Sequence, residues 1–158
     1  GLFLAAMAGA GTLSELRESL LAAEVEILGG ASPRVLPFAD VREAGALLQR
    51  AGFALPVTDV ETVTARYSTL FDLMADLRAM GATSALSARS RRPATRRFFT
   101  RAAEIYAERF SDADGRIRAT FSLIWVSGWA PAESQQKPLR PGSAEVSLAR
   151  ILKPGGGE

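Results

Sequence analysis

Apolar residues occur along the chain in blocks whose spacing predicts strands and helices in turn. Residues 2–8, LFLAAMA, form an unbroken apolar run that stops at Gly9, which is typical of a strand covered on both faces. Such strands are usually parallel to their neighbours, so we expect a buried parallel strand here. Thr12 followed by Glu15 matches a capping box, and leucines at helical spacing predict a helix that continues to about Ile27.

Three further helices follow from the same kind of spacing. Residues 39–51 are periodic and stop at Gly52, and residues 69–80 are periodic and stop before Gly81. The third helix lies within residues 91–109. Its core-facing side chains are expected to be Phe98, Phe99, Ala102, Ile105 and Tyr106.

Two more strands are predicted around these helices. Residues 53–64 alternate imperfectly, and Pro56 near their start favours an edge strand or a bend. Residues 117–129 are rich in β-branched and aromatic side chains, and we expect them to pair antiparallel with residues 57–66. The alternation of strands and helices predicts an α/β fold.

Trp125 and Trp129 lie four residues apart, so a strand directs both side chains to the same face. Large apolar side chains of this kind usually belong to a core, and we expect a helix to cover them. About three strands are few for a sheet with helices on both faces. We therefore expect the strand at residues 2–8 to have further neighbours upstream of Gly1.

The composition excludes several kinds of chemistry. The 158 residues include neither Cys nor His, which excludes disulfides, thiolate zinc sites, thiol nucleophiles and histidine-based triads, so no metal site is expected. No apolar run reaches the roughly 18 to 20 residues of a membrane span, and residues 2–8 lack the basic flank of a signal peptide. We expect a soluble protein of the bacterial cytoplasm.

The formal net charge of +2 is small, but arginines gather within residues 89–101. Such a cluster is typical of a solvated helix start, and it also suits an anionic partner. Residues 131–158 are rich in Pro, Gly, Gln and Ser, which predicts an extended polar tail after one domain at residues 1–130. We expect no nucleic-acid partner.

Candidate site residues come from loops and chain reversals. The GAGT turn at residues 9–12 resembles part of a phosphate-binding loop but lacks its full pattern, so a plain tight turn is the preferred interpretation. Arg34 precedes a predicted helix, where a guanidinium can clamp a carboxylate or simply be solvated. Arg66, Tyr67 and Arg78 also lie near chain reversals, and together they indicate an anion-lined pocket or surface. Thr83, in the turn after Arg78, is a further candidate.

Several of these segments also resemble a known family, in the same order. They are GTLSELRESL at residues 11–20, the loop that ends in Pro37 and Phe38, LFDLMADLRAMGATS at residues 70–84, and GRIRATFSLIWVSGW at residues 115–129. This order resembles the C-terminal half of class I S-adenosylmethionine-dependent methyltransferases. Within that class it is similar to the family that contains the malonyl-acyl-carrier-protein methyltransferase of biotin synthesis and a methyltransferase-like assembly factor of respiratory complex I. The tail segments AESQQKP and GSAEVS resemble the assembly-factor branch.

The resemblance implies a Rossmann-like seven-stranded sheet of which residues 2–8 are the fifth strand, a helical lid insertion at about residues 69–110 and a terminal antiparallel strand pair. It implies S-adenosylmethionine as the cofactor of the parent protein. The family's cofactor-binding motifs precede Gly1, so no cofactor-binding residue is assigned to this chain, and the isolated chain is expected to be inactive. The acceptor would be a protein or a carrier-bound acyl group, with modification of an arginine in the assembly-factor branch.

A different class of function fits the same sequence. The basic residues at 89–101 and the polar tail would then dock a partner, and the fold would serve as a non-catalytic scaffold. Self-association is a third expectation, because an apolar strand with an unpaired edge favours pairing with another copy.

Overall fold

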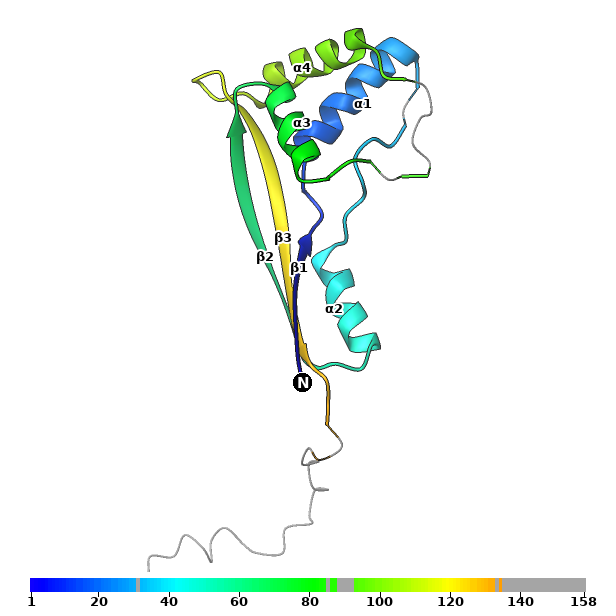
Figure 1. Ribbon diagram of the computed structural model, residues 1–158, viewed down its shortest axis with the longest axis vertical. Helices are drawn as coiled ribbons and strands as arrows, with labels where there is room; N and C mark the ends of the chain where they lie inside the picture. The colour runs from blue at the N-terminus through cyan, green and yellow to red at the C-terminus, as the bar shows by residue number, and fades with distance from the viewer. Residues whose placement is uncertain (31, 85, 88–92, 133, 135–158) are drawn as a thin grey trace, which may run out of the picture.

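The computed structural model of this protein describes residues 1–30, 32–84, 86, 87, 93–132 and 134. Within this part the elements are β1 (Leu2–Ala8), α1 (Ser14–Leu28), α2 (Val41–Arg50), β2 (Ala54–Tyr67), α3 (Leu70–Ala79), α4 (Arg96–Phe110) and β3 (Ile117–Trp129). The predicted helices and strands are all present. Helices α1, α3 and α4 gather at one end of the strands, whereas α2 lies beside their other end (Figure 1).

The strands form one antiparallel sheet in the order β1-β3-β2. The predicted antiparallel pairing of residues 57–66 with the last strand is confirmed, with Glu61 opposite Leu123 in the register. A register shift between Ala54 and Val57 contains Pro56, which lacks the N–H that a regular ladder would need. In the described chain β2 is an edge strand, as the proline predicted.

The interpretation of β1 as a buried parallel strand is wrong for the described chain. Its one neighbour is β3, the pairing is antiparallel, and six of its seven residues are exposed. The apolar run alone could not reveal this, because it reports which residues avoid water but not which partners are at hand. The described sheet has three strands, and the seven strands that the resemblance implies are not seen in it.

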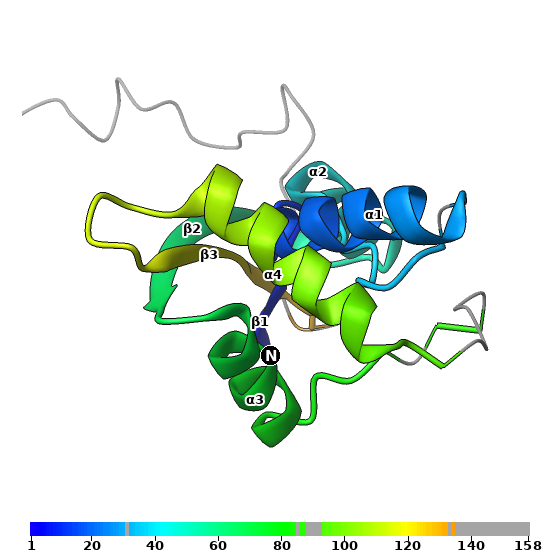
Figure 2. The same cartoon turned by 90° about the horizontal axis from the view of Figure 1, so that it is seen from above.

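Two hydrophobic clusters stabilise the described chain. The larger one joins α1, α3 and α4 to the first residues of β3, and its most buried large side chains include Leu73, Phe98, Ile105 and Tyr106. Figure 2 shows α4 crossing over α1 and β3 in this part of the molecule. The smaller cluster packs Ala44 and Leu48 of α2 against Ile124 and Val126 of β3. β3 therefore belongs to both clusters.

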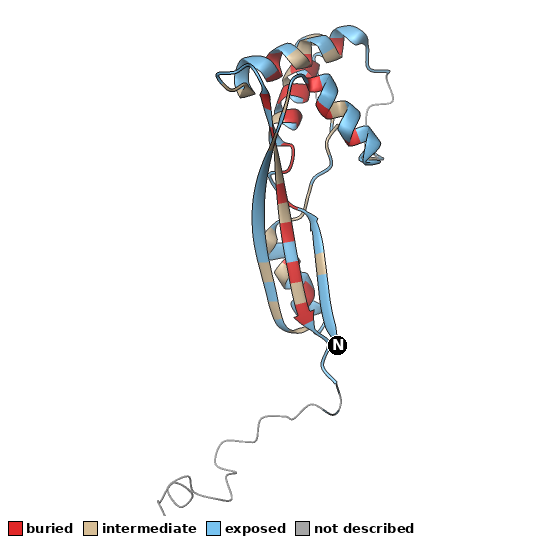
Figure 3. Cartoon of the chain, turned by 60° about the vertical axis from the view of Figure 1, so that its left-hand side comes forward, coloured by how far each residue is buried: buried red, intermediate tan, exposed pale blue. Residues whose placement is uncertain are grey.

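On the face of the sheet opposite α2, no described helix lies over Trp125 and Trp129, whereas α3 packs at the other end of this face, near Phe121. Trp125 and Trp129 share this face, as the spacing predicted, but the prediction that a helix covers them is wrong, because they are 42% and 50% exposed. In Figure 3 this side of the sheet faces the viewer, with α2 behind the strands.

The connection from β1 to α1 is a tight, hydrogen-bonded turn. The buried Thr12 hydroxyl donates to the backbone oxygen of Ser122 at 2.9 Å and accepts from its N–H at 3.1 Å. Glu15 accepts from the backbone N–H and the hydroxyl of Thr120. The predicted capping box is therefore not formed: α1 begins after Leu13, which has a φ of 54°, without a side-chain cap. Both capping candidates bond to β3 instead.

Some predictions fall on residues outside the described part. They concern the tail at 135–158 and the arginines Arg89, Arg91 and Arg92. Among the residues that are described, no helix has the length and apolar character needed to cross a membrane.

Candidate functional site

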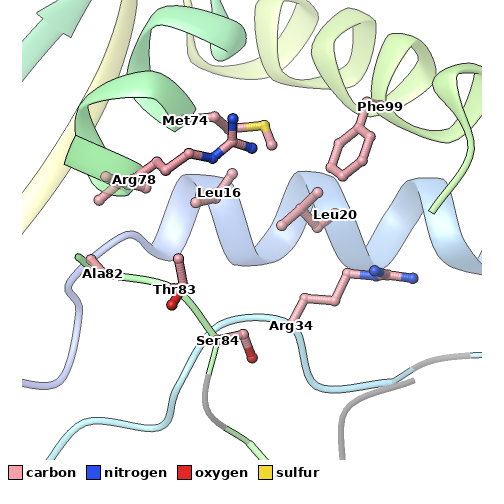
Figure 4. Close-up of a pocket in the computed structure, with 10 residues that line it drawn as sticks. Leu16, Leu20, Arg34, Met74, Arg78, Ala82, Thr83, Ser84 and Phe99 are labelled. Carbon is pink, nitrogen blue, oxygen red and sulfur yellow. The ribbon is translucent and has the colours of Figure 1, made fainter. Parts of the chain in front are cut away.

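A pocket opens between the three helices at the end of the sheet, and we call it the helical pocket. Its volume is about 300 Å³. It is lined by Leu16, Leu20, Arg34, Met74, Leu77, Arg78, Ala82, Thr83, Ser84 and Phe99. Figure 4 shows Leu16, Leu20, Met74, Arg78 and Phe99 on the helices, and Arg34, Ala82, Thr83 and Ser84 on the loops. The arrangement suits a ligand with an apolar part and a polar end.

Local capping positions the walls of this pocket. Thr69 accepts from the backbone N–H of Asp72 at the start of α3, which places Met74 and Leu77 in the wall. Thr95 accepts in the same way from Phe98 at the start of α4, next to the pocket residue Phe99. Each cap satisfies a backbone donor that the helix itself leaves free.

Arg34, one of the predicted site residues, lines the pocket but is held by an ion pair. Its Nε and Nη2 donate to the two carboxylate oxygens of Glu24 at 3.2 and 3.0 Å. Its guanidinium also lies over the ring of Phe98, with the central carbon 4.4 Å from the ring centroid. These contacts occupy the bidentate geometry that would otherwise hold an acceptor carboxylate.

Glu24 is buried, and Ser32 completes its surroundings. The Ser32 hydroxyl and backbone N–H both donate to this carboxylate, at 2.6 and 3.2 Å. Burial would raise the pKa of Glu24, but the hydrogen bonds from Arg34 and Ser32 outweigh it and hold the pKa below its ordinary value. Glu24 is thus a charged residue that fixes the loop after α1.

Arg78 and Thr83, two further predicted site residues, lie at the rim of the same pocket. Arg78 is in the last turn of α3, and it forms no ion pair within the described residues. Gly81 follows with a φ of +75°, and the N–H of Thr83 donates to its oxygen at 2.8 Å. This turn brings Thr83 across the pocket mouth (Figure 4).

Arg66, the fourth predicted site residue, does not line the pocket. Its guanidinium pairs with Asp112 at 2.8 Å and with Asp114, in the turn between α4 and β3. Arg118 also reaches Asp112 at 3.4 Å. The structure therefore brings together Arg34, Arg78 and Thr83 and leaves Arg66 in a separate charge cluster.

Charge in the helical pocket is positive on balance. Its charged lining residues are Arg34 and Arg78, and Glu24 compensates Arg34 from behind. No group of acidic residues suited to a metal occurs in the described chain. Arg78 is therefore the cation available to a ligand.

Part of the basic segment at the start of α4 is used within the fold. Arg101 donates to Glu26 and Glu104, and its hydrogen bonds to Glu26 hold the pKa of that carboxyl below its ordinary value. Arg96 and Arg97 line a second, polar depression beside this ion pair. The two interpretations of the segment, a solvated helix start and a site for an anionic partner, both stay predictions.

Comparison with known proteins gives the family. No family model matches the chain. The chain is 42% identical over 152 residues to "Arginine-hydroxylase NDUFAF5, mitochondrial" of Dictyostelium discoideum, and 40% identical over 154 residues to the human protein of that name. It is 35% identical over 142 residues to "Malonyl-[acyl-carrier protein] O-methyltransferase" of Laribacter hongkongensis. These matches confirm the resemblance to the complex I assembly factor and to the malonyl-acyl-carrier-protein methyltransferase, both of which are relatives of the class I S-adenosylmethionine-dependent methyltransferases.

The matches differ in how much of each chain they include. The first two cover 96% and 97% of this chain but 35% and 44% of those relatives, so the chain spans less than half of their length. A match that stopped at residue 134 would cover about 85% of the 158 residues, so these matches extend into the tail. The methyltransferase matches cover 83% to 90%.

These relatives correct the expected location. The relatives at about 40% identity are mitochondrial proteins by name, which contradicts the prediction of a bacterial cytoplasmic protein.

The methyltransferase relatives imply S-adenosylmethionine, but the glycine turn of this chain does not fit such a cofactor. The backbone N–H groups of Gly9, Ala10, Thr12, Leu13 and Ser14 all donate to backbone oxygens. A Cβ on Gly9 would lie 2.5 Å from Cγ1 of Ile124, so this glycine serves close packing. Most backbone donors of this turn are therefore already used within the fold, which favours the interpretation as a plain tight turn.

Sequence reasoning missed the apolar walls and the role of Glu24. Leu16, Leu20 and Phe99 have ordinary core spacing, and no sequence signal separates a pocket wall from a core. The role of Glu24 could have been predicted from its position. A glutamate on the apolar face of a helix needs a charged or hydrogen-bonding partner when it is buried.

Proposed function

We propose that this chain forms the acceptor-binding part of an S-adenosylmethionine-dependent methyltransferase-like enzyme, with the helical pocket receiving the reacting end of the acceptor. The observation that carries the proposal is an apolar pocket with a cation at its rim, Arg78, that forms no ion pair within the described residues. Support from the comparisons is the similarity to malonyl-acyl-carrier-protein methyltransferases over 83% to 90% of the chain.

The pocket has apolar walls and a partly closed mouth, which are properties that a group-transfer reaction needs in an acceptor site. Such a reaction depends on holding the acceptor in position and keeping water away, more than on covalent help from side chains. Leu16, Met74 and Phe99 supply the apolar walls, and the loop of Thr83 crosses the mouth. The cofactor would be held by residues outside this chain, since the described turn does not fit it.

Two observations bear on the acceptor class. The higher identity to the arginine-hydroxylase relatives favours a protein of the complex I assembly type with a protein acceptor, acting in mitochondria. The pocket charge favours an acceptor that carries a carboxylate close to the reacting group, because Arg78 would attract a carboxylate and repel a guanidinium. A protein or a carrier-bound acyl group with a carboxylate satisfies both.

Binding of small probes to isotopically labelled residues 1–158 tests this proposal. The probes are a malonyl thioester, its neutral amide analogue and an arginine-containing peptide, followed by nuclear magnetic resonance. We expect the malonyl thioester to shift the amides of Arg78, Thr83 and Phe99 most strongly. Because a charged hydrogen bond contributes about 1.5 to 3 kcal/mol, Arg78→Ala should weaken its binding about ten- to a hundredfold.

Arg66→Ala is the matched control, since it removes an exposed arginine from outside the pocket. Equal shifts with the neutral amide, or equal loss of binding in both variants, would contradict the assigned site. A preference for the arginine peptide would overturn the carboxylate preference.

A further inference from the structure

The helical pocket borders a second depression, between α1 and the loop that follows it, and we call this depression the loop groove. Its volume is about 400 Å³. Helix α1 contributes Arg17, Leu20 and Leu21 to its walls, and the loop contributes residues 32–35 and Pro37. Leu20 and Arg34 line both hollows, so their side chains form a common wall. A ligand that extends out of the helical pocket at this wall would enter the loop groove.

The loop wall of this groove is extended and held at both ends. Pro33 and Pro37 restrict the residues before them to extended conformations. Near the first proline, the hydroxyl and the N–H of Ser32 donate to the buried carboxylate described above. Near the second, Nη2 of Arg17 donates to the backbone oxygen of Leu36 at 3.1 Å. The wall is therefore formed before any ligand binds.

The main chain of this wall has unused hydrogen-bonding groups. None of the N–H groups at residues 34–36 bonds to a residue in the described part of the chain. An extended segment with unpaired main-chain groups can pair with a second extended chain, as the edge of a sheet does. The prolines on either side lack an N–H and limit this pairing to a short stretch. Such a wall suits a short extended peptide.

The loop groove has a positive charge beside an apolar surface. Arg17 is exposed and forms no ion pair with another described residue. Arg34, in contrast, is already neutralised by Glu24. Leu20 and Leu21 supply the apolar surface next to Arg17, and Leu21 is 44% exposed. A ligand that matches these walls carries a carboxylate next to an apolar side chain.

We propose that the loop groove binds an extended, acidic segment of a protein acceptor, next to the residue that enters the helical pocket. This inference rests on the proposed function, which leaves a protein and a carrier-bound acyl group open as acceptors, and it selects the protein. The main chain of the segment pairs with residues 34–36, its carboxylate faces Arg17, and an apolar side chain packs on Leu21. The common wall at Leu20 keeps this segment close to the reacting group.

Titration of isotopically labelled residues 1–158 with a short peptide tests this docking site. The probe is a blocked tripeptide of leucine, aspartate and leucine, and the comparison peptide has asparagine in place of aspartate. In nuclear magnetic resonance spectra, we expect the acidic peptide to shift the amides of Leu21, Val35 and Leu36. It should bind about three- to tenfold more tightly than the neutral peptide. Equal binding of the two peptides would overturn the proposal.

Arg17→Gln tests the charged contact. It should weaken binding of the acidic tripeptide by a similar factor and leave binding of the neutral one unchanged. Arg42→Gln is the matched control, because Arg42 is also exposed and has no ion pair within the described residues. An equal effect of the two substitutions on binding of the acidic peptide would contradict the role of Arg17.

Arg78→Ala separates this inference from the proposed function. It should weaken binding of the malonyl thioester and leave binding of the acidic tripeptide unchanged, whereas Arg17→Gln should do the reverse. If the thioester does not bind but the tripeptide shifts Leu21 and Val35, the proposed function fails and the peptide groove stands. If the thioester binds and the tripeptide does not, the peptide groove alone is overturned.

Two further probes test the kind of occupant. N-methylation of the tripeptide backbone should weaken binding about fivefold or more, because it removes main-chain donors. Unchanged binding would show that the main chain does not pair with the loop. Pantetheine 4′-phosphate represents the arm of a carrier protein. If it shifts the amides of Val35 and Leu36 at lower concentration than the acidic tripeptide does, the carrier arm replaces the protein segment and the proposal is overturned.

Discussion

Arg34 and Glu24 form a double hydrogen bond, with donor–acceptor distances of 3.2 and 3.0 Å, at the wall of the helical pocket. The pair links the loop after α1 to the buried face of that helix, and the Phe98 ring supports the guanidinium. Arg34 thus shapes the pocket through the fold.

Arg34→Ala should lower the free energy of unfolding by about 2 kcal/mol, because the buried Glu24 carboxylate would lose its countercharge. Urea unfolding measures this change. Arg42→Ala is the control, since Arg42 is exposed on α2 and its side chain has no ion pair within the described residues. Equal stability of the two variants would show that the pair contributes little.

The stability that Glu24 provides should depend on pH. Its pKa is lower in the folded chain than in the unfolded chain, so its contribution is present above the unfolded value. It is lost as the pH falls below about 4.5 and through the folded value. Glu24→Gln should therefore be less stable near neutral pH and should lose less stability on acidification. Parallel stability curves for the two proteins from pH 6 to pH 3 would contradict this assignment.

Gly9→Ala should destabilise the chain by about 1 to 3 kcal/mol, because the added methyl group would overlap the buried Ile124 side chain. Gly30→Ala is the matched control: a Cβ there meets no atom within 4 Å. That control should be neutral or slightly stabilising. Thermal unfolding of both variants separates packing at the turn from a general effect of replacing glycine.

Residues 1–158 should self-associate through the outer edge of β1, whose seven residues carry no charge to oppose pairing with another strand. Met7→Lys on this strand should reduce the association, and Leu47→Lys on α2 should not, although both residues are exposed. Light scattering coupled to size exclusion gives the mass. A monomer of 16.8 kDa at all concentrations would contradict the prediction.

Sequence periodicity predicted the helices well because each amphipathic face repeats several times within one element. The ends of α3 at Ala79 and of α2 at Arg50 followed from Gly81 and Gly52. Periodicity could not predict that Trp125 and Trp129 lie on an uncovered face. Alternation shows which side chains share a face, but not what covers it.

The candidate site was predicted in part for a similar reason. Arg78 and Thr83 flank one turn, so sequence proximity alone brought them together. Arg66 also lies near a chain reversal, as Arg78 does. Its guanidinium, however, forms ion pairs with Asp112 and Asp114, which lie more than 40 residues further along the chain. Partners that are remote in sequence decide whether a loop arginine is available to a ligand.

The strand order β1-β3-β2 also determines when this protein can fold during its synthesis. Within the described residues, β1 and β2 are made first but do not pair with each other, and each pairs with β3, which follows both of them in the sequence. The turn after β1 likewise needs a hydrogen bond from the Thr12 hydroxyl to the backbone oxygen of Ser122, which lies 110 residues later in the sequence. The pairings described for β1 and β2 can therefore form on the ribosome only after residues 117–129 have emerged. This three-stranded unit depends on contacts that are remote in sequence, which makes its formation a late step in the synthesis of these residues.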